Sequence, residues 1–170
     1  MERIEVVLVN EKDEPVGTME KLEAHRKGLL HRAISVFIFD QRGRLLLQQR
    51  AAHKYHSAGL WTNTCCSHPA PGESTADAAL RRLGEEMGMH TPLTFAFTFR
   101  YHAIFDNGLV EHELDHVFIG YTDEAPTPNP DEVAAYRWVD RLIIDQEVHT
   151  SPEVYTAWFK RIYRQVFEHA

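Results

Sequence analysis

The chain has 170 residues, of which 44% are hydrophobic and 25% are charged, and its formal net charge at pH 7 is −7. This size and composition predict a soluble globular domain with a hydrophobic core of its own. The negative charge argues against a nucleic-acid partner, which favours a basic face, and no apolar run reaches the roughly 18–20 residues needed to span a membrane.

The first half of the chain is predicted to contain three strands and a short helix. Ile4–Val9 is rich in β-branched residues and predicts a strand. Thr18–Arg26 predicts a short helix that is capped by its first residue. Ile34–Phe39 and Leu45–Gln49 are apolar and predict two further strands, joined by a turn that ends in glycine, as hairpin turns often do.

The clearest predicted helix covers Glu73–Met87. Ser74 or Thr75 can cap its start, and alanines and leucines at helical spacing provide an apolar face. Gly88 is expected to end it.

Three strands and a final helix are predicted for the second half. Thr94–Ile104 and Leu109–Tyr121 flank an Asn-Gly turn, which is a strong hairpin signal. Tyr136–Val139 predicts a short strand, and an aromatic-rich helix is expected to begin at Ser151. Strands mixed with helices, without regular alternation, predict an α+β fold with mixed β-sheets sandwiched by helices, an α/β/α sandwich.

The loop before the clearest helix carries the most informative residues. The stretch Trp61–Pro69 contains Cys66 and His68, and the helix that follows ends in two glutamates. A thiol, an imidazole and carboxylates this close together indicate a metal-assisted proton-transfer or hydrolytic site. The chain's two cysteines are adjacent, which rarely gives a disulfide, and its first five residues lack a signal-peptide pattern. We therefore expect a cytoplasmic protein with reduced thiols.

The helix resembles the motif of the Nudix family, G-x5-E-x7-R-E-U-x-E-E-x-G-U, in which U is aliphatic. The polar positions in register are Glu73, Arg81, Glu85 and Glu86. Two positions depart from the motif: Ser67 replaces the first glycine, and Arg82 replaces the glutamate after the arginine.

Arg82 changes the chemistry that this helix predicts. Residues 82 and 86 lie one turn apart on the same face, where two carboxylates would hold Mg2+ against a pyrophosphate. Arg82 cannot bind a metal but can neutralise a phosphate, so we expect Mg2+ on Glu86 and a diphosphate that is bound without being hydrolysed. The alternative is that Arg82, Glu85 and Glu86 form ordinary ion pairs on the helix surface.

Nearly the whole chain is similar to the type 1 isopentenyl-diphosphate isomerases, which have the Nudix fold. The family's loop motif W-T-N-x-x-C-x-H-P matches Trp61–Pro69. Further matches are the histidine segment at 24–33, the basic segment at 45–54, the E-x-E pair at 111–113 and the segment 137–140. The resemblance implies a single Nudix-type isomerase domain over residues 1–170, with a Nudix core at about 30–145 and a C-terminal helix at 151–168.

By this resemblance, the protein interconverts isopentenyl and dimethylallyl diphosphate, adding a proton at C4 and removing one from C2 through a tertiary carbocation. Glu113 is implied as the proton donor, and Cys66 as a thiolate that accepts a proton on the other face of the alkene. A nearby metal and basic groups are expected to lower the pKa of Cys66. Trp158 is implied to stabilise the cation with its indole face, although Ala157 stands where the family has proline. Tyr101 is implied to hydrogen-bond Glu113 or Cys66.

The resemblance also implies two metal sites and a cationic diphosphate site. The implied ligands of one tightly bound Zn2+ or Mn2+ are His25, His31, His68, Glu111 and Glu113. This mixture of imidazoles and carboxylates suits either ion, and the two glutamates share a face because they lie two apart on a strand. One Mg2+ is expected on Glu86 together with the small-molecule substrate. The implied contacts of its diphosphate are Lys21, Arg50, Lys54 and Arg82.

Six other histidines have no motif that supports a ligand role. They are His53, His56, His90, His102, His149 and His169. A lone histidine is more often a surface residue than a metal ligand, so the sequence assigns no ligand role to these six.

Two other functions are open on the sequence alone. A Nudix pyrophosphohydrolase of a nucleotide or other diphosphate is the alternative enzyme, because the helix keeps four polar positions of the motif. Arg82 and the Cys66 loop argue against it. A regulatory protein that binds a diphosphate without turnover is the alternative from a different class.

Overall fold

The computed structural model describes residues 4–54 and 56–170, so the first three residues of the charged start lie outside the description. The described residues form nine strands, four α-helices and one 3-10 helix. The strands are β1 (Glu5–Val9), β2 (Pro15–Glu20), β3 (His31–Phe39), β4 (Leu45–Arg50), β5 (Trp61–Thr62), β6 (Cys65–Ser67), β7 (Thr94–Ile104), β8 (Val110–Tyr121) and β9 (Val133–Val139). The helices are α1 (Lys21–Lys27), α2 (Thr75–Met87), α3 (Arg141–Thr150), the 3-10 helix η1 (Pro152–Val154) and α4 (Ala157–His169).

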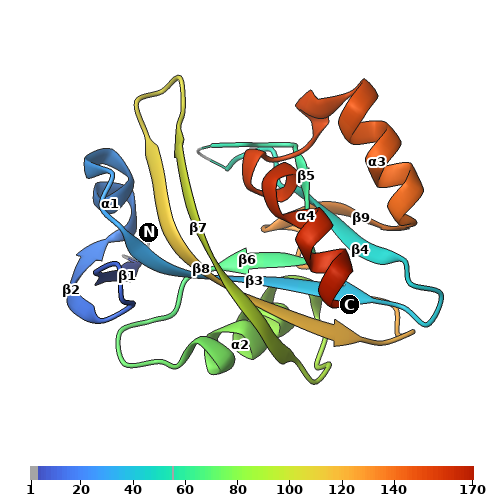
Figure 1. Ribbon diagram of the computed structural model, residues 1–170, viewed down its shortest axis with the longest axis horizontal. Coiled ribbons are helices and arrows are strands. Elements are labelled where there is room, and N and C mark those ends of the chain that lie inside the picture. The colour runs from blue at the N-terminus through green and yellow to red at the C-terminus, as the bar shows by residue number, and fades with distance from the viewer. Residues whose placement is uncertain (1–3, 55) are drawn as a thin grey trace.

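Strand β3 is the centre of one mixed sheet (Figure 1). It pairs antiparallel with β1, β4 and β6, and parallel with β8. Strands β7 and β8 form a long antiparallel hairpin that extends beyond the rest of the sheet. The register between β3 and β8 matters for the site, because it sets a predicted histidine ligand, His31, opposite a predicted carboxylate ligand, Glu113.

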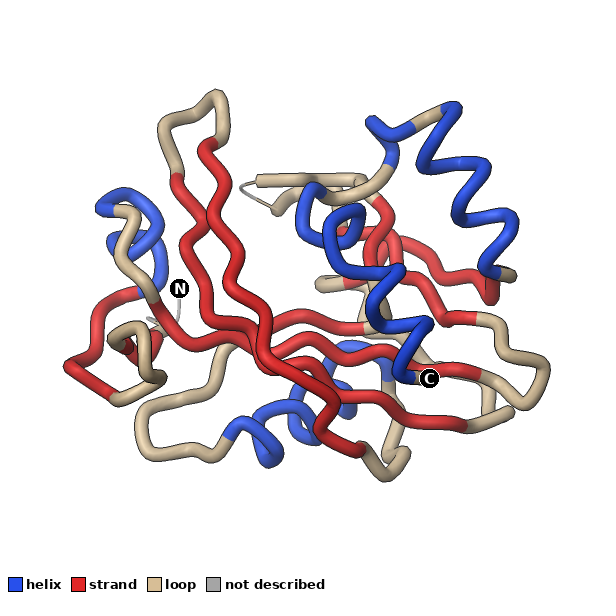
Figure 2. Tube along the Cα trace, viewed as in Figure 1, coloured by secondary structure: helices blue, strands red, loops and turns tan. Residues whose placement is uncertain are grey.

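Helices cover both faces of the sheet, as the predicted α+β sandwich requires. Successive side chains of a strand point to opposite faces. Phe37 and Phe39 of β3 therefore join the core that contains α4, while Val36 and Ile38 join the core that contains α2. Figure 2 shows α2 on one side of the strands and α3 with α4 on the other. Each large apolar side chain that is fully buried in this way stabilises the fold by about 1.5–3 kcal/mol.

The clearest predicted helix is confirmed as α2. Ser74 caps it, its hydroxyl oxygen accepting the backbone N–H of Asp77 at 3.1 Å. Gly88 ends it with φ of 62°, and a side chain there would meet the carbonyl oxygen of Thr127 at 2.5 Å. The backbone N–H of Thr127 bonds the carbonyl oxygen of Met87 at 2.8 Å, so the segment leading to β9 is tied to the end of this helix.

The helix predicted over Thr18–Arg26 begins too early. Thr18 lies in β2, opposite Val7 of β1. The N-cap of α1 is Glu20, whose side chain accepts a backbone N–H at 2.9 Å. Threonine is β-branched and suits a strand, and pairing with β1 outweighs its capacity to cap a helix.

The C-terminal region differs from the prediction in two ways. Helix α3 was not expected, and α4 begins at Ala157 instead of Ser151 because η1 intervenes. Leu142 of α3 is 76% exposed, so the helix lacks the wide buried face that makes a helix easy to recognise.

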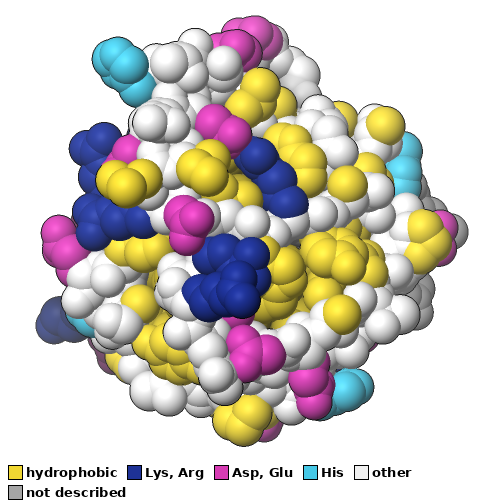
Figure 3. All heavy atoms as spheres, turned by 90° about the vertical axis from the view of Figure 1, so that its right-hand side faces the viewer, with side chains coloured by type: hydrophobic (Ala, Val, Ile, Leu, Met, Phe, Trp, Pro, Cys, Tyr) yellow, Lys and Arg dark blue, Asp and Glu magenta, His cyan; other side chains and the backbone are white. Residues whose placement is uncertain are grey.

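Figure 3 shows hydrophobic side chains gathered among lysine and arginine side chains on the side that carries α3. Among the described helices, none is long and apolar enough to cross a membrane.

Candidate active site

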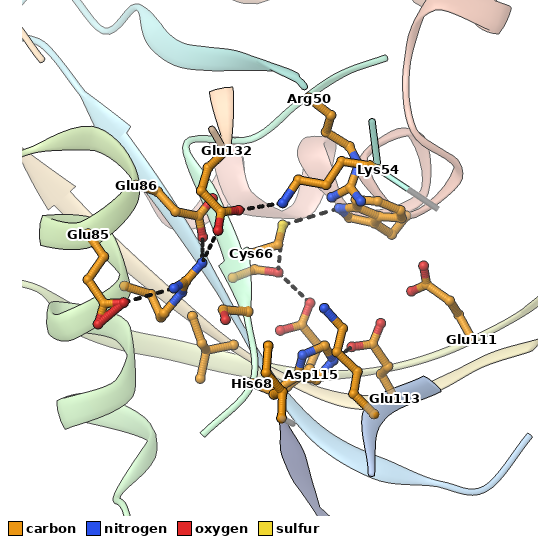
Figure 4. A pocket seen from close by; sticks show the side chains of 18 of the residues that line it. Arg50, Lys54, Cys66, His68, Glu85, Glu86, Glu111, Glu113, Asp115 and Glu132 are labelled. Atoms are coloured by element: carbon orange, nitrogen blue, oxygen red, sulfur yellow. Dashed lines mark hydrogen bonds and ion pairs between the residues drawn. The ribbon is translucent and has the colours of Figure 1, made fainter. Parts of the chain in front are cut away.

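A cavity of about 870 Å³ collects the predicted site residues from many elements. The predicted residues that line it are Lys21, His25, Arg50, Lys54, Cys66, His68, Arg82, Glu86, Tyr101, Glu111, Glu113 and Trp158. His31 is fully buried beside them. Figure 4 shows Cys66 between two groups of carboxylates, Glu86 with Glu132 on one side and Glu113 with Asp115 on the other.

The three histidines predicted as ligands lie together. One ring nitrogen from each of His25, His31 and His68 lies within 4.8 Å of the other two. Nδ1 of His25 is 2.7 Å from the carbonyl oxygen of Lys21, and Nδ1 of His31 is 2.9 Å from that of Leu29. A backbone partner on Nδ1 makes Nε2 the ligand nitrogen of a metal-binding histidine. Nε2 of His31 is buried and has no hydrogen-bond partner, so these residues fit a divalent metal.

Glu111 and Glu113 project from the same face of β8 into this cluster. Oε2 of Glu113 lies 3.1 Å from Nε2 of His68 and 3.8 Å from Nε2 of His31. Burial first, and then the charge of Glu113, raises the pKa of Glu111 well above its usual range. A bound cation would offset the cost of ionising this carboxyl group.

Burial favours the uncharged form of the buried histidines in the metal cluster. It is the largest cause that lowers the pKa of His31 and of His68 well below the usual value. His56, which has no motif, behaves in the same way: burial first, and then Arg50, lowers its pKa to about 2. Neutral imidazole is the form that binds a metal.

The four predicted cations line the same cavity as the histidines. Burial first, and then the charges of Lys54, Arg50 and Arg82, lowers the pKa of Lys21, while Glu113 raises it. Like charges this close repel one another, and a bound anion would relieve the repulsion. The cluster therefore suits a diphosphate.

Helix α2 carries both a buried carboxylate and a surface ion pair. Glu86 is 5% exposed and accepts from Gln48 at 3.2 Å, Cys65 at 3.3 Å and Arg82 at 3.1 Å. Arg82 also pairs at 2.8 Å with Glu85, whose side chain is 46% exposed. The surface-pair interpretation therefore describes Glu85, whereas Glu86 belongs to the cavity.

Glu132 joins the cation cluster without having been predicted. Its carboxylate pairs with Lys54 and lies 3.6 Å from Arg82. Its backbone carbonyl accepts the N–H of Ala51 at 3.1 Å. No local sequence pattern marks Glu132, because its position depends on how the segment before β9 bonds to the end of α2.

The sulfur of Cys66 has three polar neighbours. Trp158 Nε1 donates to it at 3.2 Å, while Asn63 Oδ1 lies at 3.0 Å and Ser35 Oγ at 3.8 Å. Ser35 donates in turn to Asp115 at 2.5 Å. Burial first, and then the charge of Asp115, raises the pKa of Cys66 to about 12. Burial and the nearby carboxylate thus act in the direction opposite to the lowering expected from a metal and basic groups, and that lowering by a bound metal stays a prediction.

Trp158 takes its predicted place in the cavity wall. It is 7% exposed, and the guanidinium carbon of Arg50 lies 5.3 Å from its ring centroid. The indole face therefore already accepts one cation. Helix α4 begins at Ala157, so the loss of the family's proline does not remove Trp158 from the site.

Tyr101 lines the cavity but does not make its predicted hydrogen bond. Its hydroxyl is buried and bonds neither Glu113 nor Cys66. The ring packs edge-on against Trp158, and Arg161 lies 5.0 Å above its centroid. Packing of the aromatic ring against Trp158 and Arg161 therefore holds Tyr101 in place, and its hydroxyl group has no hydrogen-bond partner among the described residues.

Asp115 and His56 are two further residues that line the cavity and were not predicted as site residues. Asp115 extends the two-residue period of Glu111 and Glu113 along β8, so strand alternation was a signal that could have found it. His56 lies in the irregular loop after β4, with Nε2 3.1 Å from Oε1 of Glu111. That proximity arises only from the tertiary fold.

Comparisons with known proteins identify the family to which this chain belongs. The profile of the NUDIX domain family matches residues 29–159. "Isopentenyl-diphosphate Delta-isomerase" of Pectobacterium atrosepticum is 58% identical over 162 residues, covering 95% of this chain and 90% of that protein. "Isopentenyl-diphosphate Delta-isomerase 2" of Photorhabdus laumondii is 55% identical over 157 residues, covering 92% of this chain and 89% of that protein.

Solved structures share the fold at low identity. DR0079 from Deinococcus radiodurans has a TM-score of 0.80 at 19% identity, with 95% of this chain and 98% of that chain covered. The MutT protein from Methanosarcina mazei has a TM-score of 0.66 at 19% identity, with 82% of this chain and 93% of that chain covered. The predicted Nudix fold is confirmed.

Proposed function

Because this chain belongs to the NUDIX domain family and, within it, to the isopentenyl-diphosphate Delta-isomerases, we propose that it interconverts isopentenyl and dimethylallyl diphosphate. It is an isomerase of this family rather than a general Nudix hydrolase. The observation that carries the assignment of residues is one cavity in which Cys66 and Glu113 meet a cluster of four cations. The cations suit the diphosphate, and the thiol and the carboxyl group suit two proton transfers.

Cys66 and Glu113 are the proposed proton-handling pair. Moving the double bond requires one proton added at C4 and one removed from C2, and hence two groups on opposite faces of the alkene. In the direction that forms dimethylallyl diphosphate, Glu113 donates to C4 and the sulfur of Cys66 accepts from C2. A thiol with a pKa of about 12 is rarely ionised near neutral pH, but the thiolate it forms is a strong base.

Trp158 stabilises the cationic intermediate with its indole face. Such a contact contributes about 0.5–2 kcal/mol, and the guanidinium of Arg50 already occupies a comparable position 5.3 Å from the ring centroid. Tyr101 shields the intermediate from water beside Trp158. Its buried hydroxyl has no hydrogen-bond partner among the described residues.

Two divalent metals complete the proposed site. His25, His31, His68, Glu111 and Glu113 would hold one tightly bound Zn2+ or Mn2+, and Glu86 would hold one Mg2+ that arrives with the substrate. When bound, the first ion increases the acidity of Glu113 and the second neutralises diphosphate charge. Lys21, Arg50, Lys54 and Arg82 hold the diphosphate, the arginines through paired N–H groups and the lysines as point charges.

The assay that tests this function supplies the purified protein with isopentenyl diphosphate and Mg2+ and follows the formation of acid-labile dimethylallyl diphosphate. We expect conversion without release of phosphate. Release of phosphate or a monophosphate from a panel of nucleoside diphosphates, with no isomerisation, would favour the pyrophosphohydrolase instead.

A further inference from the structure

We propose that His56 is an additional ligand of the divalent metal centre, beside His25 and Glu111. The inference rests on the metal centre of the proposed function and adds a donor that no sequence motif assigns. His56 lies in the loop between β4 and β5, which also carries Lys54.

Distances support this placement. Nε2 of His56 lies 3.1 Å from Oε1 of Glu111, and ligand atoms of His25, His56 and Glu111 all lie within 4.8 Å of one another. Two ligands on opposite sides of one ion, each about 2.1 Å from it, are about 4.2 Å apart. The three side chains are thus spaced as donors around a single ion, with only small adjustments required.

The second nitrogen of the ring supports the same assignment. Nδ1 of His56 lies 3.3 Å from the hydroxyl oxygen of Ser57, which can accept an N–H from Nδ1. In that tautomer the lone pair of Nε2 points towards Glu111. At His25 and His31 the partner of Nδ1 is a backbone carbonyl, which can only accept, so there the N–H lies on Nδ1. A lone pair and a carboxylate oxygen 3.1 Å apart repel each other unless a proton or a cation lies between or beside them. A metal ion resolves that repulsion.

Another buried histidine shows what a purely structural ring looks like. His116 uses both nitrogens, with Nδ1 3.2 Å from the carbonyl oxygen of Ala33 and Nε2 2.8 Å from the carboxylate of Asp13. It leaves no nitrogen for a metal. His56 differs in its carboxylate partner, because Glu111 forms a group of three potential metal ligands with His25 and His56, whereas Asp13 belongs to no such group among the described residues.

One ion accounts for all the donors. His25 is shared by the group with His31 and His68 and by the group with His56 and Glu111. Its Nδ1 bonds the backbone, so only Nε2 can bind a metal, and one imidazole nitrogen binds one ion. Adding His56 to the five predicted ligands gives six donors, more than the four that zinc usually takes and consistent with an octahedral ion such as Mn2+.

The test measures metal binding directly on the full-length protein. Metal-free wild type, His56→Ala, His56→Gln and His53→Ala would each be titrated with Mn2+ in the presence of a competing chelator. The visible absorption of Co2+ bound to each protein would also be recorded, because its intensity rises as the coordination number falls. His53 is the matched control, since it is an exposed histidine on the same loop and belongs to neither donor group. Circular dichroism of the metal-free variants checks that each is folded.

We expect His56→Ala and His56→Gln to bind Mn2+ at least about tenfold more weakly than wild type and to show stronger Co2+ absorption, with His53→Ala unchanged. Unchanged affinity and absorption in His56→Ala would overturn the proposal. So would full recovery in His56→Gln, because the ring would then act only through its contact with Glu111. If wild type itself bound no metal, the metal centre of the proposed function would fail instead, which keeps the two failures distinct.

Discussion

The indole N–H of Trp158 donates a hydrogen bond to the sulfur of Cys66 at 3.2 Å. One side chain thus touches the proposed base through its N–H while its ring forms part of the cavity wall. Because Trp158 comes from the C-terminal helix and Cys66 from β6, docking of α4 on the sheet assembles this contact. Proton transfer and stabilisation of the cation therefore depend on the same packing interaction.

Replacing Trp158 separates its two roles. Trp158→Phe keeps an aromatic face but removes the N–H, whereas Trp158→Leu removes both. We expect Leu to lower kcat by a further factor of about 2–30 relative to Phe, which corresponds to the 0.5–2 kcal/mol of a cation–π contact. Steady-state kinetics with isopentenyl diphosphate measures both variants.

Trp138→Phe is the control for loss of an indole elsewhere, since Trp138 lies in β9 and does not line this cavity. Equal kcat values for Trp158→Phe and Trp158→Leu would show that the ring face does not act on the intermediate.

The pH dependence of the reaction should follow Cys66. Its pKa is raised to about 12, so the thiolate fraction, and with it kcat/KM, should increase as pH rises through neutrality towards that value. Asp115 contributes to the raised pKa after burial. Asp115→Asn keeps an acceptor for Ser35 but removes the negative charge, so it should lower the pKa of Cys66 and move the ascending limb to lower pH.

The measurement is kcat/KM against pH for wild type and Asp115→Asn at saturating metal. A higher rate for the variant at neutral pH is the expected result. If the ascending part of the pH profile lay at the same pH in Asp115→Asn as in wild type, Cys66 would not be the base. A wild-type kcat/KM that fell as pH rose would lead to the same conclusion.

Arg82 should act on binding of the substrate rather than on its chemistry. Arg82→Ala removes a cation that contacts Glu85, Glu86 and Glu132. Loss of hydrogen bonds to a charged phosphate costs about 1.5–3 kcal/mol, so we expect KM to rise by about 10- to 150-fold with a smaller change in kcat.

Arg81→Ala is the matched control on the same helix. Arg81 pairs with Glu73 and with exposed Glu85, and exposed pairs contribute about 0–1 kcal/mol. Inhibition by inorganic pyrophosphate gives an independent reading, which should weaken in Arg82→Ala and change little in Arg81→Ala. Equal losses in both variants would place the diphosphate elsewhere.

The parts of the fold that the sequence predicted are those with a strong local signal. Apolar runs located β3 and β4, and the Asn-Gly turn located the β7–β8 hairpin. Ser74 and Gly88 marked the ends of α2 closely. Helix α3 was missed because only Ile144 is buried on it, and Thr18 was misassigned because pairing between strands is not visible locally.

In the candidate site, too, the features with a local sequence motif were predicted, and those that depend on tertiary packing were not. Motif spacing brought together the residues around Cys66 that line one cavity. The raised pKa of Cys66 was not foreseen, since burial and the nearby Asp115 depend on the packing of three strands. His56 and Glu132 were missed because loops bring them to Glu111 and Lys54 from distant parts of the chain.

The most direct test of the account compares wild type with Cys66→Ala at equal metal content in the conversion of isopentenyl diphosphate. We predict that wild type forms dimethylallyl diphosphate and that Cys66→Ala loses turnover by about 10²- to 10⁴-fold, while elemental analysis finds its tightly bound metal unchanged. A variant that kept most of the wild-type rate, or a metal-loaded wild type that gave no conversion, would contradict the account.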